Sequence, residues 1–148
     1  MRFQLSLEID VPRDLVVALF LDPDNLQEWQ PDLVHFEMLD GATERAVGVK
    51  SRQIHKSGSQ EVEMIETITI HDPPESFAAI YEADGIWNLV ANRFLDHEGR
   101  KTIWILDFEF KCEGWAVWFM TIFLPGMFKR QTLTFMKRFK VFVEKSAA

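Results

Sequence analysis

The sequence has very little cysteine and no hydrophobic run long enough to cross a membrane. Its single cysteine, Cys112, cannot form a disulfide within the chain, so nothing requires an oxidising compartment. The longest apolar run, residues 115–124, is about half the length that a transmembrane helix needs. The first ten residues alternate polar and apolar side chains, unlike a signal peptide. We therefore expect a cytoplasmic protein without stable membrane insertion.

Basic residues are also in short supply. Lys and Arg total 16 against 23 Asp and Glu, which gives a formal net charge of -7. Because nucleic-acid binding depends on a positive surface that releases counterions, we expect no nucleic-acid partner. A group of cations nevertheless shares the C-terminal segment with a single acid, Glu144: Lys129, Arg130, Lys137, Arg138, Lys140 and Lys145. This pattern is typical of a solvated helix face, and attraction to an anionic membrane surface or an acidic partner is the alternative.

The motifs of common catalytic and cofactor sites are missing as well. There is no Ser or Cys nucleophile signature, no phosphate-binding glycine-rich loop and no dinucleotide fingerprint, so we predict no cofactor. The histidines occur singly, without the close pairing of a zinc site: His35, His55, His71 and His97. We therefore predict no metal site, and we interpret each histidine as a surface strand residue.

Aromatic residues, by contrast, are abundant. The chain has 13 Phe and 5 Trp, and 47% of its 148 residues are hydrophobic. This is enough apolar material for one sizeable core, and we expect residues 1–148 to form a single domain. The excess aromatics indicate either a bulky core or side chains that line an internal pocket.

The strongest periodic pattern lies near the C-terminus, in residues 127–145. Large apolar residues recur there at helical spacing, with no Gly or Pro between them: Phe128, Thr132, Phe135, Met136, Phe139, Phe142 and Val143. The spacing predicts a long amphipathic helix. Such an aromatic face needs an apolar partner of similar length, which an antiparallel sheet with one apolar face would supply.

The preceding residues carry the alternation of such a sheet. The predicted strands cover residues 3–11, 33–38, 45–55, 62–70, 77–83, 86–94 and 102–110, with turn signals between them. Two short helices are predicted after the first strand, over residues 12–21 and 25–29. The first of these helices would bury Leu15, Val16, Leu19 and Phe20.

This order of elements, with three local sequences, resembles the helix-grip fold. The local sequences are Asp-Pro-Asp-Asn-Leu-Gln-Glu-Trp at residues 22–29, the strand through Glu66 and Ile68 that runs into residues 72–74, and a terminal helix ending near Glu144. The chain is similar to members of the START-like, or SRPBCC, superfamily, and most resembles its polyketide cyclase/dehydrase and lipid transport branch. The resemblance implies an α+β fold in which a seven-stranded curved antiparallel sheet surrounds the long C-terminal helix. It also implies an apolar cavity between them for a lipid, polyketide or similar hydrophobic molecule.

Glu66 is the candidate catalytic residue. It shares an alternating row with Val62, Met64, Ile68 and Ile70, so it faces inward if that row does. A buried carboxylate must be paired, hydrogen-bonded or kept protonated, and the last state suits general acid or base chemistry. The structural alternative is an internal salt bridge or hydrogen bond, for which Arg52 and Arg93 are possible partners.

Other strands offer polar side chains whose direction is open. One register of the strand 86–94 turns Asn88 and Asn92 inward, and the other turns Trp87, Leu89, Ala91 and Arg93 inward. Tyr81, the only tyrosine, either reaches a pocket or packs in the core with one hydrogen bond. In the strand 45–55, Ser51, Gln53 and His55 alternate with Lys50, Arg52 and Ile54, so both faces are polar, which favours an edge or a cavity mouth.

Three functions remain open. The first is binding or carriage of a hydrophobic small molecule, and the predicted ligand-binding residues are Met64, Glu66, Tyr81, Asn88, Asn92, Trp104, Phe128, Phe135 and Phe139. Under this hypothesis, a Trp at Ala79 or Ala91 would fill the cavity. The second is a polyketide cyclase or dehydratase-type enzyme that uses Glu66 as acid or base. The third is an interaction protein that forms a homodimer through the aromatic segment 115–128, a segment that could also cover the cavity entrance or pack as core.

Overall fold

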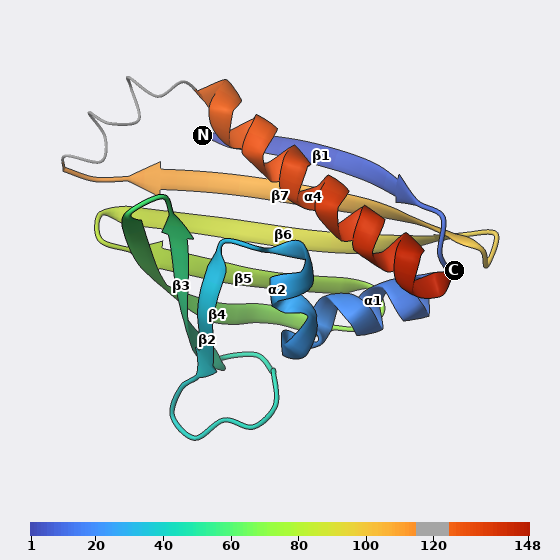
Figure 1. The fold of residues 1–148 in the computed structure, drawn as a ribbon, viewed down its shortest axis with the longest axis horizontal. Helices are drawn as coiled ribbons and strands as arrows, with labels where there is room; N and C mark the ends of the chain where they lie inside the picture. Colours follow the sequence, from blue (N-terminus) through green and yellow to red (C-terminus); the bar gives the residue numbers. More distant parts are fainter. Residues whose placement is uncertain (115–124) are drawn as a thin grey trace.

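The computed structural model describes residues 1–114 and 125–148, and in these residues a curved seven-stranded antiparallel sheet carries the helices on one face (Figure 1). The strands are β1 (Arg2–Ile9), β2 (Leu33–Met38), β3 (Lys50–Ser57), β4 (Gln60–Asp72), β5 (Ser76–Ala83), β6 (Ile86–His97) and β7 (Lys101–Cys112). Their order in the sheet is β1-β7-β6-β5-β4-β3-β2, so β2 to β7 pair in chain order and β1 pairs with β7 at one edge. The predicted helix-grip architecture is confirmed.

Two short helices follow β1, as predicted. They are α1 (Arg13–Leu21) and α2 (Leu26–Trp29), joined by a 3-10 turn, η1 (Pro23–Asn25). The Asp22 carboxylate accepts the backbone N–H of Asp24 at 3.0 Å and so begins this turn. The buried face of α1 consists of Val16, Val17 and Phe20, whereas Leu15 is 41% exposed. The prediction for Leu15 was therefore wrong, because the contact face of α1 is rotated by one residue from the predicted one.

The long C-terminal helix, α4 (Pro125–Ala147), crosses the sheet above β1 and β7 (Figure 1). It extends the predicted range by two residues at each end. Met136, Phe139 and Val143 form its most deeply buried stripe, with the other predicted apolar residues partly buried beside them. No helix in the described residues is both long enough and apolar enough to span a bilayer.

The hairpins form where the turn signals predicted them. Asp84 and Gly85 connect β5 to β6, because Ala83 pairs directly with Ile86. Gly85 has φ +72°, a conformation that favours glycine and suits a two-residue hairpin turn. The strand predicted to begin at Arg45 begins instead at Lys50, and residues 39–49 form a long loop before β3 (Figure 1).

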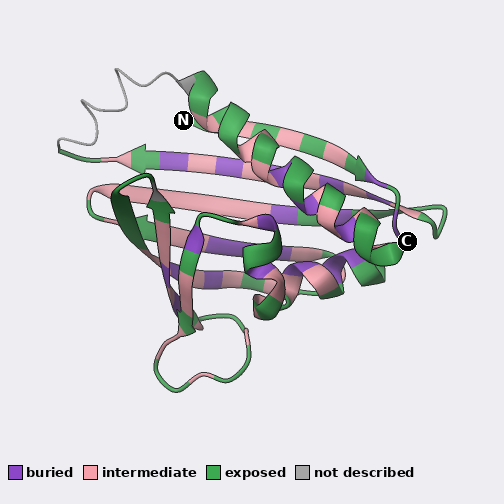
Figure 2. Cartoon of the chain, viewed as in Figure 1, coloured by how far each residue is buried: buried purple, intermediate pink, exposed green. Residues whose placement is uncertain are grey.

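The core is an aromatic cluster at one end of the concave sheet face. Phe20 lies at its centre. The centroid of its ring is 5.2–5.9 Å from the ring centroids of five neighbours: Trp29, Phe77, Phe94, Trp104 and Phe139. Buried residues alternate with more exposed ones along β7, as predicted (Figure 2). This end of the interior is therefore filled by rings, which accounts for part of the aromatic excess.

The inward row of β4 is shorter than the alternation predicted. Glu66 and Ile68 are each 2% exposed, but Val62 and Ile70 are both 45% exposed. The pairing of β4 with β5 shifts register between Ile68 and Ile70, and such an irregularity breaks the two-residue alternation there. Val62 pairs with His55 two residues from the turn of the β3–β4 hairpin, where its side chain is exposed.

Candidate functional site

A cavity of about 250 Å³ lies beside the aromatic cluster, on the concave face of the sheet. Residues of α1, α2, β3 to β7 and α4 line it, together with Arg45 from the loop before β3. Aromatic and aliphatic side chains form much of its wall, and polar side chains of β3 to β6 interrupt them. A mostly apolar wall with a few placed polar groups is typical of small-molecule sites.

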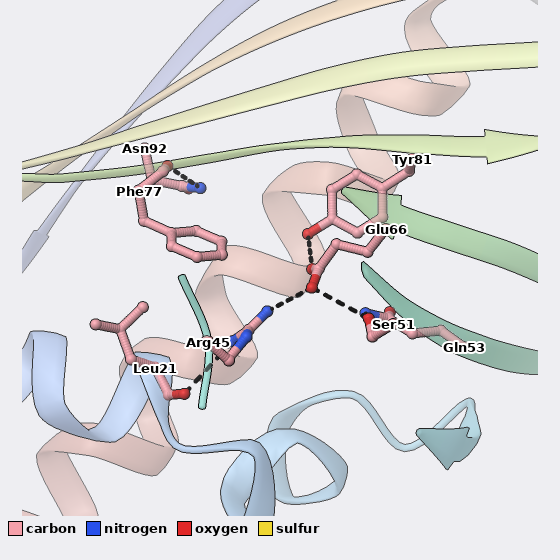
Figure 3. A network of polar contacts seen from close by, with 8 residues as sticks. All are labelled: Leu21, Arg45, Ser51, Gln53, Glu66, Phe77, Tyr81 and Asn92. Atoms are coloured by element: carbon pink, nitrogen blue, oxygen red, sulfur yellow. Dashed lines mark hydrogen bonds and ion pairs between the residues drawn. The ribbon is translucent and has the colours of Figure 1, made fainter. Parts of the chain in front are cut away.

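A buried polar network surrounds Glu66 at this wall (Figure 3). Oε1 of Glu66 accepts hydrogen bonds from Arg45 Nη2 at 2.8 Å and from Ser51 Oγ at 3.2 Å. Oε2 accepts the Tyr81 hydroxyl at 2.7 Å. Gln53 Nε2 donates to Ser51 Oγ at 3.1 Å. The carboxylate is thus held by donors from two neighbouring strands and the loop, and it faces a buried cation.

Arg45 ties the loop 39–49 to the interior of the fold. Its side chain is 8% exposed, and its Nη1 donates to the backbone oxygen of Leu21 at 3.4 Å (Figure 3). The guanidinium carbon lies 4.8 Å from the ring centroid of Phe77, which is a cation–π distance. One arginine therefore contacts the end of α1, the β5 wall and the Glu66 carboxylate.

The predicted partners of Glu66, Arg52 and Arg93, were wrong. Arg52 pairs with Glu63 at 3.1 Å on the opposite face of the sheet, since it stands across from Ile65 and not from Glu66. Arg93 follows the inward-facing Asn92, and it lies 3.6 Å from Asp107 on the outer face. The two-residue alternation of a strand places both arginines away from the cavity.

Tyr81 is a hydrogen-bond donor that stays protonated in the folded protein. Burial raises the pKa of its hydroxyl well above the ordinary value, and the adjacent Glu66 carboxylate raises it further. The fold therefore favours the protonated hydroxyl. Because the pKa of tyrosine in the unfolded state is about 10, the stability that this preference contributes is complete below pH 10 and is lost at higher pH. Since Tyr81 is the only tyrosine, tyrosinate absorbance should appear only together with unfolding in an alkaline titration. Absorbance that titrates near pH 10 in the folded protein would contradict this assignment.

His55 lines the cavity, so it is not the surface strand residue that we predicted. Burial lowers the pKa of its imidazole, and the nearby Asp32 opposes this effect. As the pH falls below about 6.5, His55 therefore binds a proton in the unfolded state more readily than in the folded state. The free energy of unfolding should decrease below that pH. Urea unfolding at pH 7.5 and 5.5 should show a larger loss of stability in the wild type than in His55→Gln. Equal losses would mean that the fold does not disfavour the charged imidazole.

The register of β6 turns Asn88 and Asn92 toward the cavity, which resolves the open choice between the two faces. Asn92 uses both ends of its amide inside the protein. Its Nδ2 donates to the oxygen of Phe77 at 3.2 Å, and its Oδ1 accepts Trp104 Nε1 at 2.9 Å. Asn88 differs, because its Oδ1 is buried and has no hydrogen-bond partner among the described residues.

Most of the predicted ligand-binding residues line the cavity, and the rest lie elsewhere. The lining residues are Met64, Glu66, Tyr81, Asn88, Asn92 and Phe135. Trp104 and Phe139 belong to the aromatic cluster, with centroids 5.2 Å apart, and Phe128 lies 5.3 Å from Phe110 by the same measure. Ala79 and Ala91 do not line the cavity either, and Ala91 lies beside Leu89 in a shallow depression of the outer sheet face.

Several cavity residues were missed by the sequence reasoning. Arg45 lies in a loop without periodicity, so no pattern indicated where its side chain points. Trp29 was assigned to a helix but not to a site. Gln53 lines the cavity and is 4% exposed, and Ser51 beside it is 2% exposed, in a strand that was expected at an edge or a cavity mouth. β3 in fact lies between β4 and β2, and its polar inward side chains were the available signal.

Within residues 1–114 and 125–148, no group of three or more His, Cys, Asp or Glu side chains could hold a metal ion. Cys112 is a free thiol at the last position of β7, partly buried. The predictions for residues 115–124, which were a cavity cover, core packing or a dimer surface, lie outside the described residues.

The strand order, the C-terminal helix across the sheet and the cavity between them define a protein of the START-like, or SRPBCC, type. The chain belongs to the polyketide cyclase / dehydrase and lipid transport family, which matches residues 1–144. This membership supports either ligand binding or cyclase chemistry and does not decide between them. A search of curated proteins found no significant sequence match.

Solved structures of similar fold are distant in sequence. A conserved protein from Geobacillus kaustophilus has a TM-score of 0.81 at 15% identity, over 99% of this chain and 97% of its own. The Zhui aromatase/cyclase from a Streptomyces species has a TM-score of 0.78 at 13% identity, over 100% of this chain and 96% of its own. Norcoclaurine synthase from Thalictrum flavum, solved with dopamine and hydroxybenzaldehyde, has a TM-score of 0.72 at 12% identity, over 98% of this chain and 87% of its own. At these identities the likeness shows the fold alone.

Proposed function

We propose that this protein binds or carries a hydrophobic small molecule in the cavity between the sheet and α4. The observation that carries the proposal is the cavity itself, since the aromatic cluster fills one end of the interior and leaves about 250 Å³ unfilled beside it. Native interiors are otherwise close-packed, so a void of this size with an apolar wall and a few polar groups is best explained by an occupant.

A cyclase or dehydratase-type activity with Glu66 as acid or base is the alternative, and the family supports it equally. The geometry of Glu66 favours carriage. A carboxylate offers about four acceptor positions, and Arg45, Ser51 and Tyr81 occupy three of them. Arg45 also lies 2.8 Å from Oε1 of Glu66, so the carboxylate is engaged in a buried ion pair and is not free to contact a ligand. Its network instead holds the loop 39–49 at the cavity wall.

The test is a competition assay in which a fluorescent fatty acid is displaced by apolar ring compounds from the purified protein. Saturable binding of one probe per chain, displaced competitively, supports the proposal. Heat-unfolded protein serves as the control for non-specific adsorption. Absence of saturable binding of the fatty acid and of the ring compounds alike to the folded protein would count against carriage.

A further inference from the structure

Within the part of the chain that the structure describes, three polar atoms of cavity-lining residues are buried without a hydrogen-bond partner in the protein. They are Nε1 of Trp29, Nε of Arg45 and Oδ1 of Asn88. Trp29 is 2% exposed and the Arg45 side chain is 8% exposed. Unpaired polar atoms at this depth are costly, and most buried polar groups in proteins have a partner. Their occurrence on the wall of one cavity points to a partner inside it.

The three atoms specify what such a partner must offer. Trp29 Nε1 and Arg45 Nε are both N–H donors, so each needs an acceptor. Asn88 Oδ1 is an acceptor and needs a donor. Two of the nearby polar groups are already engaged, since both Glu66 oxygens accept hydrogen bonds and Asn92 is satisfied at both ends of its amide. A purely hydrocarbon ligand would leave all three atoms unpaired.

The cavity also limits the size and shape of the ligand. Its volume of about 250 Å³ lies below the roughly 300–1,000 Å³ typical of drug-sized sites. A two-chain lipid is therefore too large, whereas one or two rings fit. Aromatic side chains stand on several sides of the space, from α1, α2, β5, β7 and α4: Phe20, Trp29, Phe77, Tyr81, Phe108 and Phe135. Rings among rings can stack or meet edge to face, which favours a planar ligand over a flexible chain.

We propose that the ligand is a compact hydroxylated aromatic compound, whose hydroxyl donates to Asn88 and whose oxygen accepts from Trp29 or Arg45. This inference rests on the proposed function, because it names the ligand class of the same cavity. Carbonyl oxygens on the same ring system would also serve the two donors. A hydroxyl that donates to Asn88 distinguishes this class from simple fatty acids, whose carboxylates are ionised at neutral pH and offer no donor.

The test uses three naphthalenes of similar size and measures their dissociation constants by calorimetry. 2-Naphthol offers a donor and an acceptor, 2-methoxynaphthalene an acceptor only, and 2-methylnaphthalene neither. The wild type should bind 2-naphthol about tenfold more tightly than the methyl ether, and the ether severalfold more tightly than the hydrocarbon.

Two variants assign these preferences to atoms. Asn88→Leu removes the acceptor with little change in size, and it should abolish the preference for naphthol over its ether. Trp29→Phe keeps an aromatic ring and removes the N–H, and it should reduce the preference for the ether over the hydrocarbon. Circular dichroism and urea unfolding identify any variant that does not fold, and each variant tests a different atom.

The outcomes separate the two proposals. Saturable wild-type binding of all three compounds with equal affinity would overturn the hydroxylated ligand and leave carriage of a hydrophobic molecule standing. Preferences that persist in folded Asn88→Leu and Trp29→Phe would also overturn it. If no naphthalene and no fatty acid binds saturably, both proposals fail.

Discussion

Replacing Arg45 with leucine is expected to destabilise the fold by about 3–5 kcal/mol, because it leaves the Glu66 carboxylate buried without its cation. Glu66 is 2% exposed and Arg45 Nη2 lies 2.8 Å from its Oε1. Urea unfolding of the variant and the wild type measures the loss of stability.

The control for this prediction is Arg52→Leu on the outer face of the sheet. Arg52 also pairs with a glutamate at 3.1 Å, but that glutamate, Glu63, is 53% exposed. Exposed pairs contribute about 0–1 kcal/mol, so Arg52→Leu should cost little. The double variant Arg45→Leu/Glu66→Leu removes both charges and should recover part of the loss. A cost for Arg45→Leu no larger than for Arg52→Leu would mean that the buried network does not form.

Replacing Val90 with tryptophan is expected to weaken ligand binding by a factor of ten or more. Val90 lines the cavity from β6, and an indole at this position would occupy much of the 250 Å³ that the ligand needs. The fold should survive, because the added rings enter existing space and do not displace packed side chains. The fluorescent fatty acid competition assay measures the loss of affinity, and thermal unfolding reports the stability.

The matched control is Ala91→Trp, one residue further along β6. Successive side chains of a strand point to opposite faces, and Ala91 lies in a depression of the outer sheet face. This variant adds a larger side chain to the same strand and should bind like the wild type. If Ala91→Trp weakens binding as much as Val90→Trp, the ligand does not occupy the inner cavity.

Much of the fold could be predicted because the deciding signals are local. The alternation along β7 placed Trp104 and Phe108 on the inner face, and the Asp-Gly pair located the β5–β6 hairpin. The spacing of apolar residues in α4 identified the stripe around Phe139. Each of these follows from a period of two or 3.6 residues, which the sequence displays directly.

The site was harder to predict, because it depends on contacts between distant segments. Arg45 reaches Glu66 from a loop that has no period, across 21 residues of chain. The irregularity between Ile68 and Ile70 breaks an alternation that looks continuous in the sequence. Both registers of β6 bury apolar residues, so only pairing with β5 and β7 fixes the direction of Asn88. The cavity is space that no residue fills, and composition cannot distinguish lining rings from packed ones.

The most direct measurement is a crystal structure of the protein with 6-bromo-2-naphthol, in which anomalous scattering locates the bromine. We predict a single strong bromine position in the cavity, between the β6 wall at Val90 and the rings of Trp29 and Phe135, with the hydroxyl near Asn88. A cavity that remains empty or collapses at a saturating ligand concentration, with bromine only on the outer surface, would contradict the account.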